Sequence, residues 1–136
     1  AAVDGAPGLE GKRQDVRGSS RLGDESPAAW RDSLEQVHVA GAPKLAETVF
    51  FHRPSRTLIV TDFVFNLVEV DGFMTRLLFR MTGVHGRLAQ SRMWRLFARE
   101  RGLTAGSLER ILAWPIERLV PAHGAVIGEG AGPPFI

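Results

Sequence analysis

Two side chains suited to chemistry stand where predicted strands end. Residues 58–60, Leu-Ile-Val, form an apolar run without alternation, as in a strand covered on both faces, and Asp62 follows them closely. His123 follows a short predicted strand and precedes Gly124, which favours a turn. A rigid strand holds a carboxylate at its end in place, while the open end of the sheet admits a ligand. The alternative is that Asp62 only caps the next turn or helix.

The other candidate groups are weaker. Three further histidines have no partner at metal-ligand spacing, and we interpret them as strand or loop residues: His38, His52 and His85. Glu47 opens a segment made of Thr, Val and Phe, so its carboxylate needs a partner if it is buried. We expect a salt bridge from Glu47 to Arg53 or Arg56. The chain has no cysteine, no glycine-rich phosphate loop and no hydrolase triad order.

A β-hairpin is the element that must position Asp62. Residues 48–52 are β-branched or aromatic at four of five positions, and residues 57–61 are rich in β-branched side chains. Pro54 and Ser55 lie between these segments, where the chain must turn. The pattern therefore predicts two strands joined by a short turn.

The segment before the hairpin carries a helix start and a short strand. Ser26 can cap a helix whose first residue is Pro27, where the missing N–H costs nothing. We predict a helix over residues 28–34 and a strand over 37–39, ended by the Gly-Ala-Pro turn at 41–43. Residues 1–25 are rich in Gly, Ser and charge, so we expect a surface loop or the start of a truncated domain.

Two helices are predicted directly after the hairpin. Apolar residues in 73–81 and 89–101 recur at the spacing of a helix face, and Gly83 and Gly102 are placed to end these helices. The second helix carries arginines at positions 92, 95 and 99 on its polar side. We interpret them as a solvated face, and the alternative is a basic patch that meets phosphates or an acidic partner.

A third helix and two short strands complete the predicted domain. Thr104 can cap this helix and Pro115 stops it. Its core-facing side chains are expected to be Leu108, Ile111 and Leu112. Short strands are predicted at residues 118–120 and 125–127, and residues 128–136 form a C-terminal tail.

Composition and charge narrow the function classes. The 136 residues are 44% hydrophobic and 24% charged, which is typical of a globular domain. No apolar run reaches the roughly 18 residues of a membrane span, and we expect a cytoplasmic protein without a membrane partner. The net charge of +2 makes nucleic acid an improbable partner, although residues 74–101 hold seven arginines and one acidic residue. Arginine outnumbers lysine 15 to 2, which suggests a GC-rich bacterial genome.

The strand ends also carry a family resemblance. Leu-Ile-Val-Thr-Asp at 58–62 resembles the strand that ends in Gly-Asp in the metallo-β-lactamase fold, with Thr61 where that family usually has Gly. Pro-Ala-His-Gly at 121–124 resembles the family's last metal-binding His. With Pro-Gly-Leu at 7–9 and the hairpin, the chain is most similar to an uncharacterised branch of that fold, domain-of-unknown-function family 4336. The resemblance spans roughly residues 7–127.

The resemblance implies an α/β fold, the C-terminal half of an αββα sandwich. We expect one domain over residues 26–127, with a hairpin and short strands packed against about three to four helices. Asp62 and His123 are the implied metal ligands, since carboxylate oxygen and imidazole nitrogen suit Zn²⁺ or Fe in a centre that activates water.

The chain departs from that family at several ligand positions. The fold's principal motif, His-x-His-x-Asp-His, is absent and would belong to an N-terminal half that this sequence does not include. The fold's middle His would fall near Ala42, which cannot ligate a metal. A catalytic zinc site needs three protein ligands and an open position, so we expect this chain alone to bind metal weakly or not at all.

Two functions are consistent with these residues. The first is a metal-dependent, hydrolase-like protein of unknown substrate whose incomplete or degenerate site includes Asp62 and His123. The second is a metal-free binding or scaffold module derived from the same fold. In either case half a sandwich exposes apolar sheet surface, so we expect it to be covered by the missing N-terminal half, a companion chain or a second copy.

Overall fold

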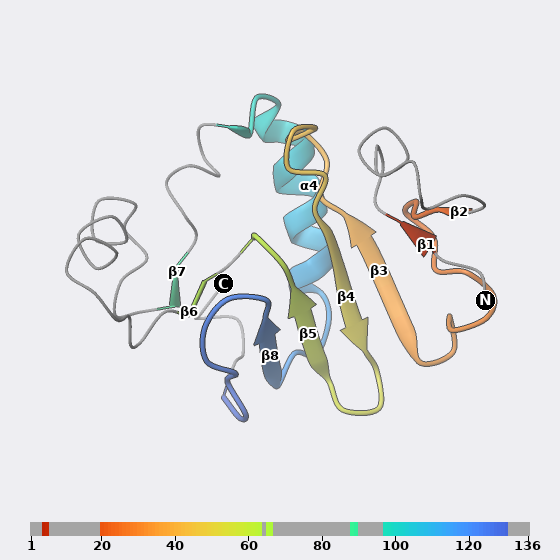
Figure 1. Ribbon diagram of the computed structural model, residues 1–136, viewed down its shortest axis with the longest axis vertical. Helices are drawn as coiled ribbons and strands as arrows, with labels where there is room; N and C mark the ends of the chain where they lie inside the picture. The colour runs from red at the N-terminus through yellow and green to blue at the C-terminus, as the bar shows by residue number, and fades with distance from the viewer. Residues whose placement is uncertain (1–3, 6–19, 64, 67–87, 90–96, 131–136) are drawn as a thin grey trace.

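The computed structural model describes residues 4–5, 20–63, 65–66, 88–89 and 97–130, and Figure 1 draws the remainder as a thin grey trace. Its centre is a four-stranded sheet in the order β3-β4-β5-β8. These strands are β3 (Leu34–His38), β4 (Thr48–His52), β5 (Thr57–Val60) and β8 (Arg118–Pro121). β3, β4 and β5 run antiparallel, whereas β8 is parallel to β5, so the sheet is mixed.

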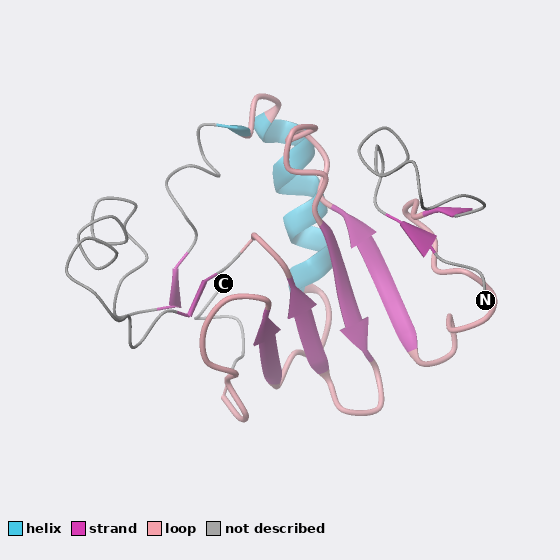
Figure 2. Ribbon diagram, viewed as in Figure 1, coloured by secondary structure: helices cyan, strands magenta, loops and turns pink. Residues whose placement is uncertain are grey.

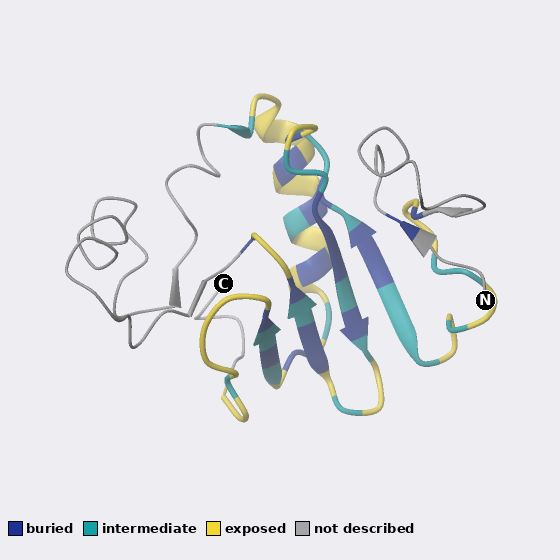
Figure 3. Ribbon diagram, viewed as in Figure 1, coloured by how far each residue is buried: buried dark blue, intermediate teal, exposed yellow. Residues whose placement is uncertain are grey.

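One helix, α4 (Arg101–Leu112), packs against one face of this sheet in the described part of the chain (Figure 2). The side chains that alternate toward α4 form the core, and Figure 3 colours much of the central strands as buried. The most completely buried are Val37, Val39, Val49, Leu58, Val60, Ile111 and Leu119. Stacking of Phe51 on Trp114, with ring centroids 5.2 Å apart, closes the core at the end of α4. The chain is therefore an α/β protein, as predicted.

Two minor strand pairs lie outside the central sheet. β1 (Asp4–Gly5) pairs in parallel with β2 (Ser20–Arg21), so the first 25 residues contain regular structure as well as loop. β6 (Phe65–Asn66) pairs antiparallel with β7 (Leu88–Ala89). The predicted helix over 73–81 falls outside the described residues. The predicted helix 89–101 is wrong at residue 89, which belongs to β7, and at residues 98–100, which are not helical, although residue 97 is helical. Gly102 does not end a helix as predicted, because it lies inside α4, which begins at Arg101.

The hairpin prediction is confirmed, because β4 and β5 pair antiparallel and the turn between them contains Pro54 and Ser55. The helix over 28–34 is wrong. Hydrogen-bonded turns replace it, with Leu34 donating its N–H to the Trp30 carbonyl at 2.8 Å, and β3 begins at Leu34. The strand over 125–127 is also wrong, since Ile127 makes only an isolated bridge to Leu119.

Two buried hydroxyls explain why α4 starts earlier than a Thr104 cap would allow. The Thr104 hydroxyl donates to the Ala40 carbonyl at 2.9 Å, and the Ser107 hydroxyl accepts the Ala40 N–H at 3.1 Å. Thr104 is thus committed to the chain beyond β3 and sits inside the helix, which begins at Arg101. Ile111 faces the core and Leu108 packs against it, but Leu112 is 41% exposed, contrary to prediction.

Gly41 makes the contact between the β3 end and α4 possible. Its φ is +83°, and an added Cβ would lie 2.5 Å from the Glu100 carbonyl oxygen and 2.6 Å from the Thr104 hydroxyl. Both the left-handed backbone and the close approach exclude a side chain here.

We predict that Gly41→Ala lowers the free energy of unfolding by about 2 kcal/mol or more, from backbone strain and steric overlap. Guanidinium chloride denaturation followed by circular dichroism measures the change. Gly106→Ala is the matched control, because nothing lies within 4 Å of its added Cβ and it sits inside α4. The control should gain about 0.5–1 kcal/mol, and a Gly41→Ala protein as stable as wild type would contradict the prediction.

Candidate functional site

Parallel pairing of β5 with β8 brings the predicted site residues together. Val60 is in register with Pro121, and Asp62 and His123 each follow two residues later, at the carboxyl ends of adjacent strands. The His123 Nε2 atom lies 3.4 Å from the Asp62 Oδ1 atom, and the two side chains are 56% and 54% exposed. The structure thus places both groups at one edge of the sheet, open to solvent.

The spacing of these two atoms fits a shared ion. Metal bonds of about 2.0–2.2 Å at a tetrahedral angle separate two ligand atoms by about 3.4 Å. No group of three or more His, Cys, Asp or Glu residues at metal-binding spacing occurs among the described residues. The part of the chain that the structure describes therefore offers two groups, Asp62 and His123, to any such ion, and their role as metal ligands stays a prediction.

A buried carboxylate supports the strand end that carries Asp62. Glu47 is 2% exposed, and its Oε1 accepts the Thr61 N–H at 2.8 Å. Its Oε2 accepts the Asp62 N–H at 3.1 Å and also the Thr61 hydroxyl. Glu47 precedes β4 and Asp62 follows β5, so these bonds join the two ends of the hairpin. They fix the main chain at the residue that presents its carboxylate to His123.

The predicted salt bridge from Glu47 to Arg53 or Arg56 is wrong. Arg53 donates to Glu35 at 2.7 Å, and Arg56 pairs with Glu117 instead. Both arginines flank the turn at the far end of the hairpin, whereas Glu47 lies beside the end of β5, where main-chain N–H groups satisfy it. The position of Glu47 before an apolar strand correctly indicated that its carboxylate is buried. The sequence does not show whether main-chain N–H groups or a cationic side chain will bind that carboxylate.

His38 and His52 do not join the Asp62–His123 pair. His38 Nδ1 lies 3.3 Å from the Thr48 hydroxyl, and His52 Nδ1 lies 2.7 Å from the Ser55 hydroxyl. Both side chains therefore form hydrogen bonds within the sheet and its turn, in agreement with our interpretation of these histidines as strand or loop residues. His85 lies outside the described residues. Ala42, near which the family resemblance would place a further His, is buried in the core at 2% exposure.

The comparisons with known proteins identify no relative. No protein-family model matches the chain, and no curated protein or solved structure is similar to it. Within the described residues, no helix has the length and apolar character needed to cross a membrane. The site must therefore be judged on its own geometry.

We predict that Glu47→Gln lowers the free energy of unfolding by about 2 kcal/mol, because the amide cannot accept all the N–H and O–H groups that Glu47 binds. Urea denaturation measures the loss. Glu117→Gln is the matched control, since it removes only exposed ion pairs with Arg56 and Arg118 and should cost less than about 1 kcal/mol. Equal losses in the two variants would show that the Glu47 bonds do not hold the strand end.

Proposed function

We propose that the chain is a metal-dependent, hydrolase-like protein whose site includes Asp62 and His123. The observation that carries the proposal is the 3.4 Å approach of these side chains at the carboxyl ends of two parallel strands. This edge of an α/β sheet is where ligands commonly bind, because side chains there are held by strands and still reach solvent. The finer fold that we propose is the C-terminal half of a metallo-β-lactamase-like αββα sandwich.

The residues have separable roles in this proposal. A bound Zn²⁺ or Fe ion would supply Lewis acidity and lower the pKa of a coordinated water. Asp62 and His123 would hold this ion. Glu47 acts through the main chain, because it accepts the consecutive N–H groups of Thr61 and Asp62 and so limits movement of the Asp62 carboxylate. The missing ligands would come from the partner that we propose to cover the sheet: an N-terminal half, a companion chain or a second copy.

A second candidate is a metal-free binding or scaffold module of the same fold. One observation favours it: the described residues bring no third His, Asp or Glu to the pair. Asp62 and His123 then form a surface ion pair when the imidazole is protonated, and an ion pair this exposed contributes little to stability. The two candidates differ in whether a metal ion binds between the side chains.

Zinc titration of the full chain, followed by NMR of the imidazole resonances, distinguishes the two candidates. We expect Zn²⁺ to shift the His123 resonances with weak apparent affinity, because the described residues offer only two ligand groups. We expect Asp62→Asn to weaken this affinity about tenfold further, since it replaces an anionic ligand with a neutral amide. His52→Asn is the matched control, because His52 bonds to Ser55 in the hairpin turn and should not affect zinc binding.

Two results of this titration would contradict the hydrolase proposal. A His123 signal that does not respond to zinc, or an Asp62→Asn protein that binds zinc as wild type does, favours the metal-free module. Where zinc binds, hydrolysis of p-nitrophenyl acetate by the zinc-loaded chain tests the reaction. The rate should fall in both Asp62→Asn and His123→Asn, and a rate equal to that of zinc alone would reject hydrolysis of this ester.

A further inference from the structure

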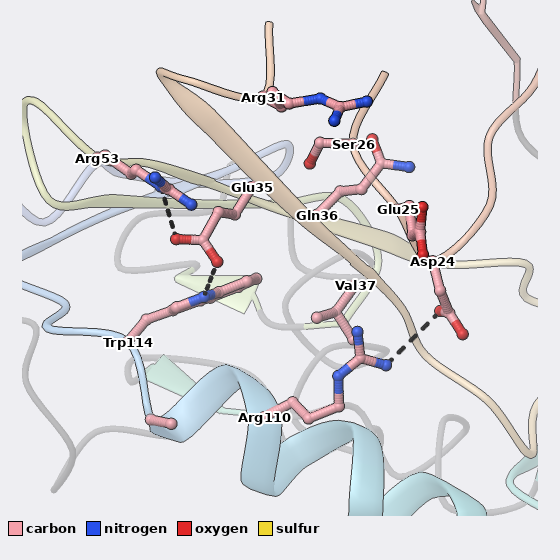
Figure 4. A pocket seen from close by; sticks show the side chains of 11 residues that line it. Asp24, Glu25, Ser26, Arg31, Glu35, Gln36, Val37, Arg53, Arg110 and Trp114 are labelled. Carbon is pink, nitrogen blue, oxygen red and sulfur yellow. Dashed lines mark hydrogen bonds and ion pairs between the residues drawn. The ribbon is translucent and has the colours of Figure 1, made fainter. Parts of the chain in front are cut away.

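A groove of about 500 Å³ lies along the outer edge of β3, away from the Asp62–His123 site. Residues 24–26 and Arg31 form one wall, and Trp114 and Arg110 form the other (Figure 4). β3 is the outermost strand on this side of the central sheet. The groove therefore runs beside main chain that has no neighbouring strand within the sheet.

The register of β3 on β4 shows which main-chain groups face this groove. Val39 donates its N–H to Glu47, and Ser33 accepts from Arg53, so alternate residues counted from these positions face β4. Gln36 pairs with Phe50 between them, which turns its N–H and C=O away from β4 and toward the outer edge. Neither group has a hydrogen-bond partner among the described residues.

One atom of the Gln36 side chain, Oε1, also lacks a partner. Its Nε2 donates to the Gly23 carbonyl at 2.7 Å, which fixes the orientation of the amide and leaves Oε1 as an acceptor. Gln36 is only 3% exposed, and its Oε1 is buried without a hydrogen bond. Buried polar groups are nearly always paired, because each unpaired group costs about 1–3 kcal/mol. One residue here has its N–H, C=O and Oε1 all unsatisfied.

We infer that the groove binds an extended segment of another polypeptide, which adds as a strand to the β3 edge. Such a segment offers the C=O and N–H that the Gln36 main chain lacks. Its residue directly opposite Gln36 has its side chain on the same face of the sheet, so a hydroxyl or amide there can donate to Oε1. The partner is thus an extended peptide with Ser, Thr, Asn or Gln at that position.

The walls of the groove suit this kind of ligand. Glu35 holds one end rigid, since it accepts from Arg53 at 2.7 Å and from the Trp114 indole at 3.0 Å. On the opposite wall, the Gly23 carbonyl accepts from the Gln36 Nε2, and Asp24 lies 3.8 Å from Arg110. Arg31 also lines the groove, so charges of both signs surround the site.

Binding can be tested with fluorescein-labelled pools of short peptides rich in β-branched residues, with Ser or Thr at the centre. We expect fluorescence anisotropy to detect binding, and we expect N-methylation of the central residue, which removes its N–H, to weaken it about tenfold. Gln36→Pro should weaken binding similarly, because proline lacks the N–H that faces the groove. Gln36→Leu keeps the main-chain groups and should lose only the preference for Ser or Thr.

Amide hydrogen exchange on the wild-type chain gives a readout that does not depend on variant folding. The Gln36 N–H should exchange quickly in the free protein and become protected when the peptide pool is added. No binding at about millimolar peptide, or binding unaffected by N-methylation, overturns the inference. Protection of Gln36 that rises with protein concentration in the absence of peptide also overturns it, since the occupant is then a second copy of the chain.

Discussion

The parallel contact between β5 and β8 is the constraint on which the rest of this structure depends. The two strands are joined by a long connection that includes α4, and their pairing requires that helix to cross the sheet. The same crossover buries Ile111 and Leu119 against the hairpin and places Asp62 beside His123. The pairing of β5 with β8 therefore completes both the core and the site.

Buried polar side chains join elements of the fold through hydrogen bonds, in addition to the apolar packing of the core. Glu47 joins the ends of the hairpin through main-chain N–H groups, and Thr104 and Ser107 attach α4 to the residues that follow β3. Each of these side chains is buried and bonded. Gln36 departs from this rule, because its Oε1 is buried without a hydrogen bond. We therefore propose a ligand at the β3 edge, where Gln36 lies.

The sequence predicted the β4–β5 hairpin and the helix that precedes Pro115, but it also predicted a helix over 28–34 and a strand over 125–127 that the structure does not contain. The hairpin was recognisable because β-branched and aromatic residues flank a proline turn, and strand ends pointed to Asp62 and His123. The helix over 28–34 failed because pairing with β4 recruits Leu34 into a strand, which local propensity cannot show. The hydrogen-bond partners of Glu47 and the unpaired groups of Gln36 depend on strand register, so no residue pattern in the sequence reveals them.

The long connection between β5 and β8 also has a kinetic consequence. Hairpin β4–β5 closes a short turn, whereas β8 must find β5 across a much longer loop, whose closure costs more entropy. Contacts of such high sequence separation slow folding. The hairpin can therefore form early with Asp62 at its end, while His123 arrives only with the last and slowest contact. A chain arrested before that step keeps most of its local structure but has no site.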